Sequence, residues 1–253
     1  VTHGVNACAL ALALGRHAGL DGPATEALGL GTLLMDVGKL AVPREVLDRR
    51  RSLTATEWAF VKRHVRAARE RLAADGLPAA VLAVVRDHHE RVDGSGYPRG
   101  LAGAQVPLPA RIAGIADTYD AMLSRRPYRF PHRPEHALQR MLDAADRTFG
   151  RGLVEEFVRC IGTFPAGSLV ELDDGALAIV AGSRPGAGLW PTVLMLRTPA
   201  GVPYAKRLLL NLEAAHQPGG RVGARSIRRS VLESEADVDV AEVAANAFGL
   251  DAA

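Results

Sequence analysis

The sequence predicts a mainly α-helical protein, in which a helical bundle is followed by a small C-terminal antiparallel β module. Apolar residues recur at helical spacing through about the first 160 residues, and Pro, Gly or capping residues mark the ends of these stretches. After Phe164, short apolar runs alternate with Gly- and Pro-rich turns, as in a small sheet. We therefore expect a helical domain at 1–162, a β module at 163–215 and a polar tail at 216–253 with a possible terminal helix at 239–248.

The composition of the 253 residues excludes several classes of protein. A hydrophobic content of 48% is enough for a sizeable core, but no uninterrupted apolar run approaches the ~18 residues of a membrane span. The apolar run at 7–14 is too short and has no cleavage site after it, so we expect a core helix rather than a signal peptide. Two cysteines, Cys8 and Cys160, fit a reducing cytoplasm. A net charge of +3 permits an anionic ligand but does not indicate DNA or RNA binding.

The first predicted helix, 2–18, carries His3 on the apolar face formed by Ala7, Leu10 and Leu14. These residues share a face because side chains three or four positions apart lie side by side on a helix. A histidine in such a place is either a packed core residue or a ligand that points into the protein.

A second helix is predicted over 23–36, because proline is favoured in a first helical turn and Gly38 is a typical stop. Met35 and Asp36 stand at its end, and Lys39 follows. Only three of the 31 basic residues are lysines, so Lys39 beside an acid indicates a position that needs a compact ammonium group. The third predicted helix, over 55–74, begins with a capping box and carries His64.

Two adjacent histidines close the apolar run 79–85, and a turn-rich segment that includes Tyr97 follows them. Neighbours on a helix point about 100° apart. We therefore expect that His88 and His89 do not bind one ion in the same way, and that they suit two ions, or one ion and a substrate oxygen. The alternative is a solvated helix C-terminus, where the helix dipole favours a protonated histidine.

The next predicted helix begins at Pro109 and presents a stripe of small residues with one acid. The stripe consists of Ala110, Ala113, Gly114, Asp117 and Ala121. Small residues allow a backbone to approach a metal cluster closely and to present Asp117 to it; otherwise Asp117 is a surface acid. A basic turn with Arg126 and Arg129 follows, and these arginines either cap the helix or bind phosphate.

The rest of the chain is predicted from simpler patterns. Two helices at 134–149 and 152–161 close the helical domain. In the β module, the strands are expected at 169–172, 176–181 and 192–196, with 208–210 as a further candidate.

The segment His-His-Glu-Arg-Val-Asp-Gly-Ser-Gly-Tyr-Pro at 88–98, with Ala-Arg-Ile at 110–112 and Ile-Ala-Asp at 115–117, resembles the HD-GYP branch of the HD phosphohydrolase superfamily. The resemblance covers about residues 1–160. It implies an HD-type helical bundle, and a metal-dependent phosphodiesterase that acts on cyclic di-GMP in bacterial signal transduction.

The resemblance also implies a role for each residue that matches a family motif. The implied metal ligands are His3, Asp36, His64, His88, His89 and Asp117. Asp36 is then the bridging carboxylate and Lys39 stabilises the phosphate, which makes these two the implied catalytic residues. Tyr97 is expected beside the guanine or ribose, and Arg126 and Arg129 on the phosphates. The implied cofactor is a divalent transition metal, iron or manganese.

One family motif is broken, because Met35 stands where the family has its signature histidine. A thioether is a soft ligand that matches iron or manganese poorly. We therefore expect Met35 to pack in the core with Leu28, and the protein to hold fewer ions than an intact family site. The family's glutamate four residues before the first ligand histidine would fall before Val1.

Three functions follow as alternatives. The first is a cyclic di-GMP phosphodiesterase impaired by the loss of the histidine. The second is a catalytically inactive receptor that still binds cyclic di-GMP. The third is an interaction module for diguanylate cyclase domains of the GGDEF type, which the resemblance also implies as partners. Because Asp36, Lys39, the downstream histidines and both arginines are retained, ligand binding is favoured over a purely structural role.

Overall fold

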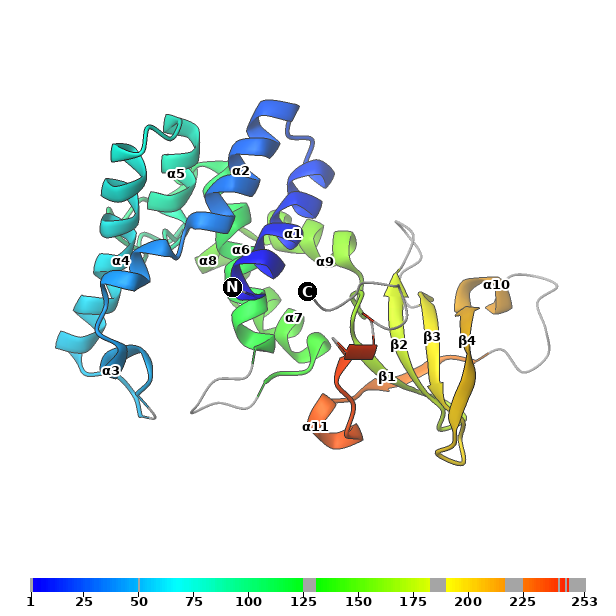
Figure 1. Cartoon of the computed structure of the whole chain (residues 1–253). Helices are drawn as coiled ribbons and strands as arrows, with labels where there is room; N and C mark the ends of the chain where they lie inside the picture. Colours follow the sequence, from blue (N-terminus) through cyan, green and yellow to red (C-terminus); the bar gives the residue numbers. More distant parts are fainter. Residues whose placement is uncertain are drawn as a thin grey trace. The chain divides into compact units, whose positions relative to one another are not determined.

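The computed structural model describes residues 2–49, 51–124, 131–182, 190–216 and 225–240, together with 242, 243 and 245. The chain divides into two compact units (Figure 1). One consists of Val1–His132 with Gln139–Cys160, and the other of Arg133–Leu138 with Ile161–Ala253. The first unit is helical and the second contains an antiparallel sheet, so the predicted fold class is confirmed. Within these described ranges, no helix has the length and apolar character needed to cross a membrane.

The helices of the first unit follow the predicted pattern closely. They are α1 (Thr2–His17), α2 (Gly22–Leu34), η1 (Val37–Ala41), α3 (Arg44–Leu47), α4 (Ala55–Ala74), α5 (Ala79–Asp87), η2 (Gly103–Gln105), α6 (Leu108–Leu123), α8 (Ala145–Thr148) and α9 (Arg151–Ile161), while α7 (Pro134–Asp143) is divided between the units. The predicted capping box of α4 forms, since the Thr54 hydroxyl accepts from the Glu57 amide and the Glu57 carboxylate accepts from the Thr54 amide.

Two helix ends differ from the sequence prediction. The second helix stops at Leu34 rather than at Asp36, because the amide of Lys39 bonds to the Asp36 carbonyl in a 3₁₀ turn that passes through Gly38. The segment 134–149 forms two helices with a break at Ala144. No glycine or proline stands at this break, which is why the pattern predicts a single helix.

Two glycines bring the backbones of the first unit unusually close together. A Cβ at Gly38 would lie 1.9 Å from the carbonyl oxygen of His64, so η1 rests directly on α4. A Cβ at Gly114 would lie 2.5 Å from the carbonyl oxygen of His88, so α6 also lies very close to the end of α5. These two contacts place the backbones of η1 and α6 against the residues that carry His64 and His88.

The sheet of the second unit has the strand order β4-β3-β2-β1-β5, and neighbouring strands are antiparallel. Its strands are β1 (Leu169–Leu172), β2 (Leu177–Gly182), β3 (Thr192–Arg197), β4 (Pro203–Asn211) and β5 (Ile227–Ser230), with short helices α10 (Leu212–His216) and α11 (Glu233–Ala236). Successive residues of β1 and β2 belong to two different apolar clusters, because alternate side chains of a strand point to opposite faces.

Strand β5 comes from the segment that the sequence analysis assigns to a polar tail. It pairs with β1, and its residues Arg228 and Arg229 form ion pairs with Glu171 on that strand. Consecutive arginines give the strand a polar appearance in the sequence, although Ile227 packs against the sheet core. Of the possible terminal helix at 239–248, the structure describes residues 239, 240, 242, 243 and 245, and all of these but the first are helical.

Candidate metal centre

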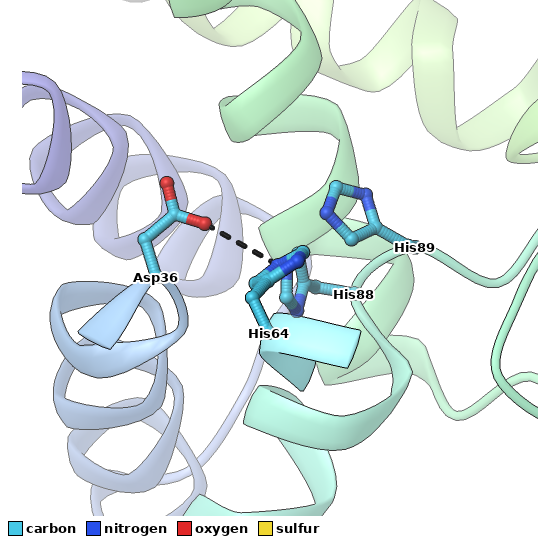
Figure 2. Close-up of side chains that lie close together, drawn as sticks. All are labelled: Asp36, His64, His88 and His89. Carbon is cyan, nitrogen blue, oxygen red and sulfur yellow. Dashed lines mark ion pairs between the residues drawn. The ribbon is translucent and has the colours of Figure 1, made fainter. Parts of the chain in front are cut away.

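The residues predicted as metal ligands come together in the first unit, although they are distant in sequence. They are His3 on α1, Asp36 after α2, His64 on α4, His88 and His89 after α5, and Asp117 on α6. Asp36, His64, His88 and His89 offer ligand atoms within 4.8 Å of one another (Figure 2), and we call them the histidine group. His3, Asp36 and Asp117 do the same, and we call them the carboxylate group. Asp36 belongs to both groups.

Two rings of the histidine group are oriented by their own helices. His64 Nδ1 donates to the Val61 carbonyl at 2.6 Å, and His88 Nδ1 donates to the Val85 carbonyl at 2.9 Å. Because a carbonyl only accepts, these bonds place the proton on Nδ1 and leave the lone pair on Nε2. A histidine that ligates a metal uses the same arrangement, with its second nitrogen bonded to a carbonyl or carboxylate.

The atoms that face the centre of the histidine group have no other partner. Nε2 of His64, Nε2 of His88 and Oδ1 of Asp36 are buried and make no hydrogen bond within the described structure. His64 Nε2 lies 3.5 Å from Asp36 Oδ1, and the dashed line in Figure 2 marks this pair. A buried polar atom without a partner destabilises the folded state by about 1–3 kcal/mol. A divalent cation would satisfy all three atoms together, so these residues fit a metal ion.

Burial keeps the three imidazole rings of the histidine group neutral. Burial lowers the pKa of His64 and of His88 below the ordinary value of about 6.5. Burial, with a smaller contribution from the neighbouring His88, lowers the pKa of His89 well below that value. Neutral imidazole is the form that coordinates a metal, so the three rings can act as ligands at neutral pH without first losing a proton.

The carboxylate group has the opposite character. His3 Nε2 lies 3.1 Å from Asp117 Oδ1 and 3.6 Å from Asp36 Oδ2, and His3 Nδ1 donates to Asp120 Oδ2 at 2.6 Å. Hydrogen bonds to Asp117 and Asp120 outweigh burial and raise the pKa of His3 to about 9. Burial would raise the pKa of Asp117, but its hydrogen bond with His3 and its interactions with His89 and His88 hold that pKa below the ordinary range.

The adjacent histidines lie where the helix ends. Helix α5 stops at Asp87, and His88 is its C-terminal cap. Beyond this point the chain turns, and the ring centroids of His88 and His89 lie 4.0 Å apart. One ligand atom of each residue therefore falls in the same histidine group.

Met35 and Lys39 flank the shared carboxylate. Met35 is 1% exposed and Leu28 is fully buried, as expected for core residues. The Lys39 ammonium donates to Asp36 Oδ2 at 2.5 Å, so in this structure its partner is the predicted bridging carboxylate. With a side chain that is one-third exposed, Lys39 also reaches the surface of the site.

Two buried acids that sequence reasoning missed hold the loop after the histidines. The Glu90 carboxylate accepts from the amides of Arg99 at 2.7 Å and Leu101 at 2.9 Å. Asp87, which is fully buried, pairs with the guanidinium of Arg99 at 2.8 Å. These contacts fold the loop back so that Tyr97 stacks on His89, with ring centroids 4.6 Å apart.

Asp120 is a third residue that the sequence analysis did not identify. It is 5% exposed, orients His3 through Nδ1, and accepts a second bond from Asn6 at 3.0 Å. Its spacing could have identified it. Asp120 lies three residues after the candidate ligand Asp117, and residues three apart lie on one helix face. Arg126 and Arg129, predicted to bind phosphate, lie outside the described residues.

Comparison with known proteins agrees with this architecture. Residues 2–153 match the model of the HD domain family. A cyclic di-GMP phosphodiesterase of Pseudomonas aeruginosa is 40% identical over 179 residues, which are 70% of this chain and 43% of that protein. A 3'3'-cGAMP-specific phosphodiesterase of Vibrio cholerae is 41% identical over 116 residues, which are 46% of this chain and 27% of that protein.

The chain thus spans less than half the length of these curated relatives. Among solved structures, an HDGYP protein from Bdellovibrio bacteriovorus aligns with a TM-score of 0.52 and 21% identity, over 61% of this chain and 50% of that one. At this identity the likeness concerns the fold. With the family model matched over more than half of its length, the chain belongs to the HD domain family and resembles that family's HD-GYP branch.

Proposed function

We propose that the protein is a metal-dependent phosphodiesterase that acts on cyclic di-GMP, with activity reduced by Met35 in place of the family histidine. The observation that carries this proposal is the pair of ligand groups that share Asp36, one of them lined by buried nitrogen atoms without a partner. Relatives named as phosphodiesterases of cyclic di-GMP and of 3'3'-cGAMP support a cyclic dinucleotide as the substrate.

The ligand sets favour two ions of unequal affinity. When bound, a pair of divalent ions supplies a nucleophilic water and neutralises charge on the phosphate. His64, His88 and His89 would hold one ion with Asp36, while His3 and Asp117 would share the other with Asp36. The carboxylate group has fewer ligands and a protonated His3 in the metal-free protein, so we infer that its ion is the weaker one. Imidazole and carboxylate ligands suit iron or manganese, whereas soft metals prefer the sulfur ligands that both groups lack.

The other residues of the site would position the substrate. Lys39 can turn from Asp36 toward a phosphate oxygen, because an ammonium group on a flexible stem reaches either partner. Tyr97 covers His89 and would exclude water from one side of the reacting phosphate. Arg126 and Arg129 remain proposed phosphate contacts.

A second candidate is an inactive receptor for cyclic di-GMP. It is favoured by the carboxylate group, in which Met35 adds no ligand and only three residues remain. A third candidate, contact with GGDEF-type domains, is favoured by the exposed side chains of Asp93, Ser95 and Pro98 on the loop. Both candidates are compatible with the same fold. Unlike the main proposal, neither includes hydrolysis of cyclic di-GMP.

The test combines metal analysis with turnover of cyclic di-GMP in added Mn²⁺ or Fe²⁺. We expect fewer than two tightly held ions per chain and slow hydrolysis that is lost in His64→Ala. Asp146→Asn is the matched control, because this acid on α8 is exposed and pairs with Arg151 outside both groups. Tight binding of cyclic di-GMP without turnover would favour the receptor. A metal-loaded protein that neither binds nor hydrolyses it would refute both.

A further inference from the structure

Beyond the ligand histidines, a row of aromatic rings leads outward from the centre. Tyr97 stacks on His89 at an interplanar angle of 27°, and Trp58 meets Tyr97 edge to face, with centroids 6.2 Å apart at 80°. Trp58 comes from the N-terminal part of α4, the helix that also carries His64. The indole is 43% exposed, so much of its surface stays open to solvent.

A lysine accompanies the two outer rings. Lys62 Nζ lies 5.2 Å from the centroid of Tyr97 and 5.9 Å from that of Trp58. Trp58 and Lys62 are four residues apart and so share one face of α4. Lys62 is exposed and forms no ion pair with any acid in the described part of the chain. Its charge is therefore available to a ligand that reaches the rings.

A comparison on the same helix separates this arrangement from ordinary surface packing. Phe60, two residues after Trp58, is 41% exposed and lies under the guanidinium of Arg63 at 4.9 Å. Residues two apart point about 200° from each other on a helix. Phe60 is thus an exposed aromatic residue with a cation on another side of α4, outside the row of rings that begins at His89.

We propose that Trp58 and Lys62 form a base-binding subsite, which accepts one guanine of the dinucleotide whose phosphate lies at the metal centre. The inference rests on the proposed function and names the part of the substrate that these residues recognise. Single-stranded nucleotides bind proteins by stacking bases on exposed aromatic side chains. A lysine beside the stacked base favours guanine, because guanine presents the acceptors O6 and N7 where adenine presents a donor at N6.

The chain offers a direct optical test, because it contains two tryptophans. In a Trp190→Phe background, Trp58 is the one remaining fluorophore of this kind. The Mn²⁺-loaded protein is mixed with cyclic di-GMP or with cyclic di-AMP in a stopped-flow instrument and read before turnover accumulates. We expect cyclic di-GMP to quench the fluorescence of Trp58 and cyclic di-AMP to bind more weakly.

Substitutions then measure each contribution, and calorimetry replaces fluorescence for the variants that lack Trp58. Trp58→Leu removes the aromatic face and should weaken cyclic di-GMP binding roughly 5- to 150-fold, as loss of one stacked base does. Trp58→Phe should retain much of the affinity, and Phe60→Leu is the matched control, with no expected change. Lys62→Met should reduce the preference for cyclic di-GMP over cyclic di-AMP by about tenfold. Circular dichroism and thermal unfolding verify that each variant is folded.

The failure of this subsite is distinguishable from failure of the proposed function. Two results together would overturn the subsite and leave the phosphodiesterase proposal standing. They are unquenched Trp58 fluorescence in the Trp190→Phe protein and normal affinity of Trp58→Leu for cyclic di-GMP. Equal losses in Trp58→Leu and Phe60→Leu would also overturn it, because the effect would then not depend on the row of rings. If the wild type binds neither dinucleotide, both proposals fail.

Discussion

Replacing Gly38 by alanine should destabilise the first unit and disturb the histidine group at the same time. The added Cβ would lie 1.9 Å from the His64 carbonyl oxygen and 2.6 Å from the Ala68 amide nitrogen. Both atoms belong to the backbone of α4, so no side chain can turn aside to make room. To reach ordinary contact, η1 and α4 must move apart by more than about an ångström, a displacement that a close-packed interior resists.

The expected loss of stability follows from this overlap. Overpacking of a well-filled interior costs about 1–3 kcal/mol, and the backbone contact puts Gly38→Ala at the upper end of that range. For a protein of this size, each kcal/mol lowers the melting temperature by about 2–4 °C. We therefore expect thermal unfolding about 6–12 °C lower than that of the wild type, together with weaker retention of the ion in the histidine group.

Calorimetry and elemental analysis of the same samples measure both effects. Gly152→Ala is the matched control, because a Cβ at Gly152 meets no atom within 4 Å and the residue lies on α9. An unchanged melting temperature and metal content in Gly38→Ala would refute the argument that close backbone contact positions His64.

Three further predictions concern the centre and its loop. Met35→His should add a nitrogen ligand beside Asp36 and raise turnover of cyclic di-GMP with Mn²⁺ by orders of magnitude; rapid turnover by the unmodified protein would contradict a disabling role for Met35. Because the pKa of His3 is raised to about 9, its ring is protonated at pH 7, and an ion entering the carboxylate group should release about one proton. Calorimetry in buffers of different ionisation heat detects this release, and heats that do not vary with buffer would contradict it. Glu90→Gln should weaken the loop by about 1–3 kcal/mol, seen as faster amide exchange at Arg99 and Leu101 with unchanged exchange elsewhere.

Much of the helical unit could be predicted because its signals are local. The capping box of α4 and the small residues of α6 are visible in short stretches of sequence, and the structure shows the expected elements there. The ligand residues were found because they belong to motifs of a recognisable family. In the structure these candidate ligands converge in two groups that share Asp36, and their role as metal ligands stays a prediction.

The features that were missed depend on contacts between distant segments. Glu90 and Asp120 look like ordinary charged residues in the sequence, and only tertiary structure shows that they bind loop amides and the ring of His3. Strand β5 was missed for the same reason, since Arg228 and Arg229 suit a strand only when Glu171 stands on its neighbour. A short stretch of sequence does not show which distant residue a polar side chain will bind, so its structural role cannot be predicted from that stretch.

The hydrogen bonds of His64 and His88 to carbonyls three residues earlier bear on how the site selects an ion. Because these bonds are made within α4 and at the end of α5, the rotamers of both rings are set when the helices form. Ion uptake then loses little side-chain conformational entropy. With its rings fixed, the histidine group also cannot adjust its size to every cation. The spacing of the folded helices would therefore determine which of several metals of similar affinity fits best.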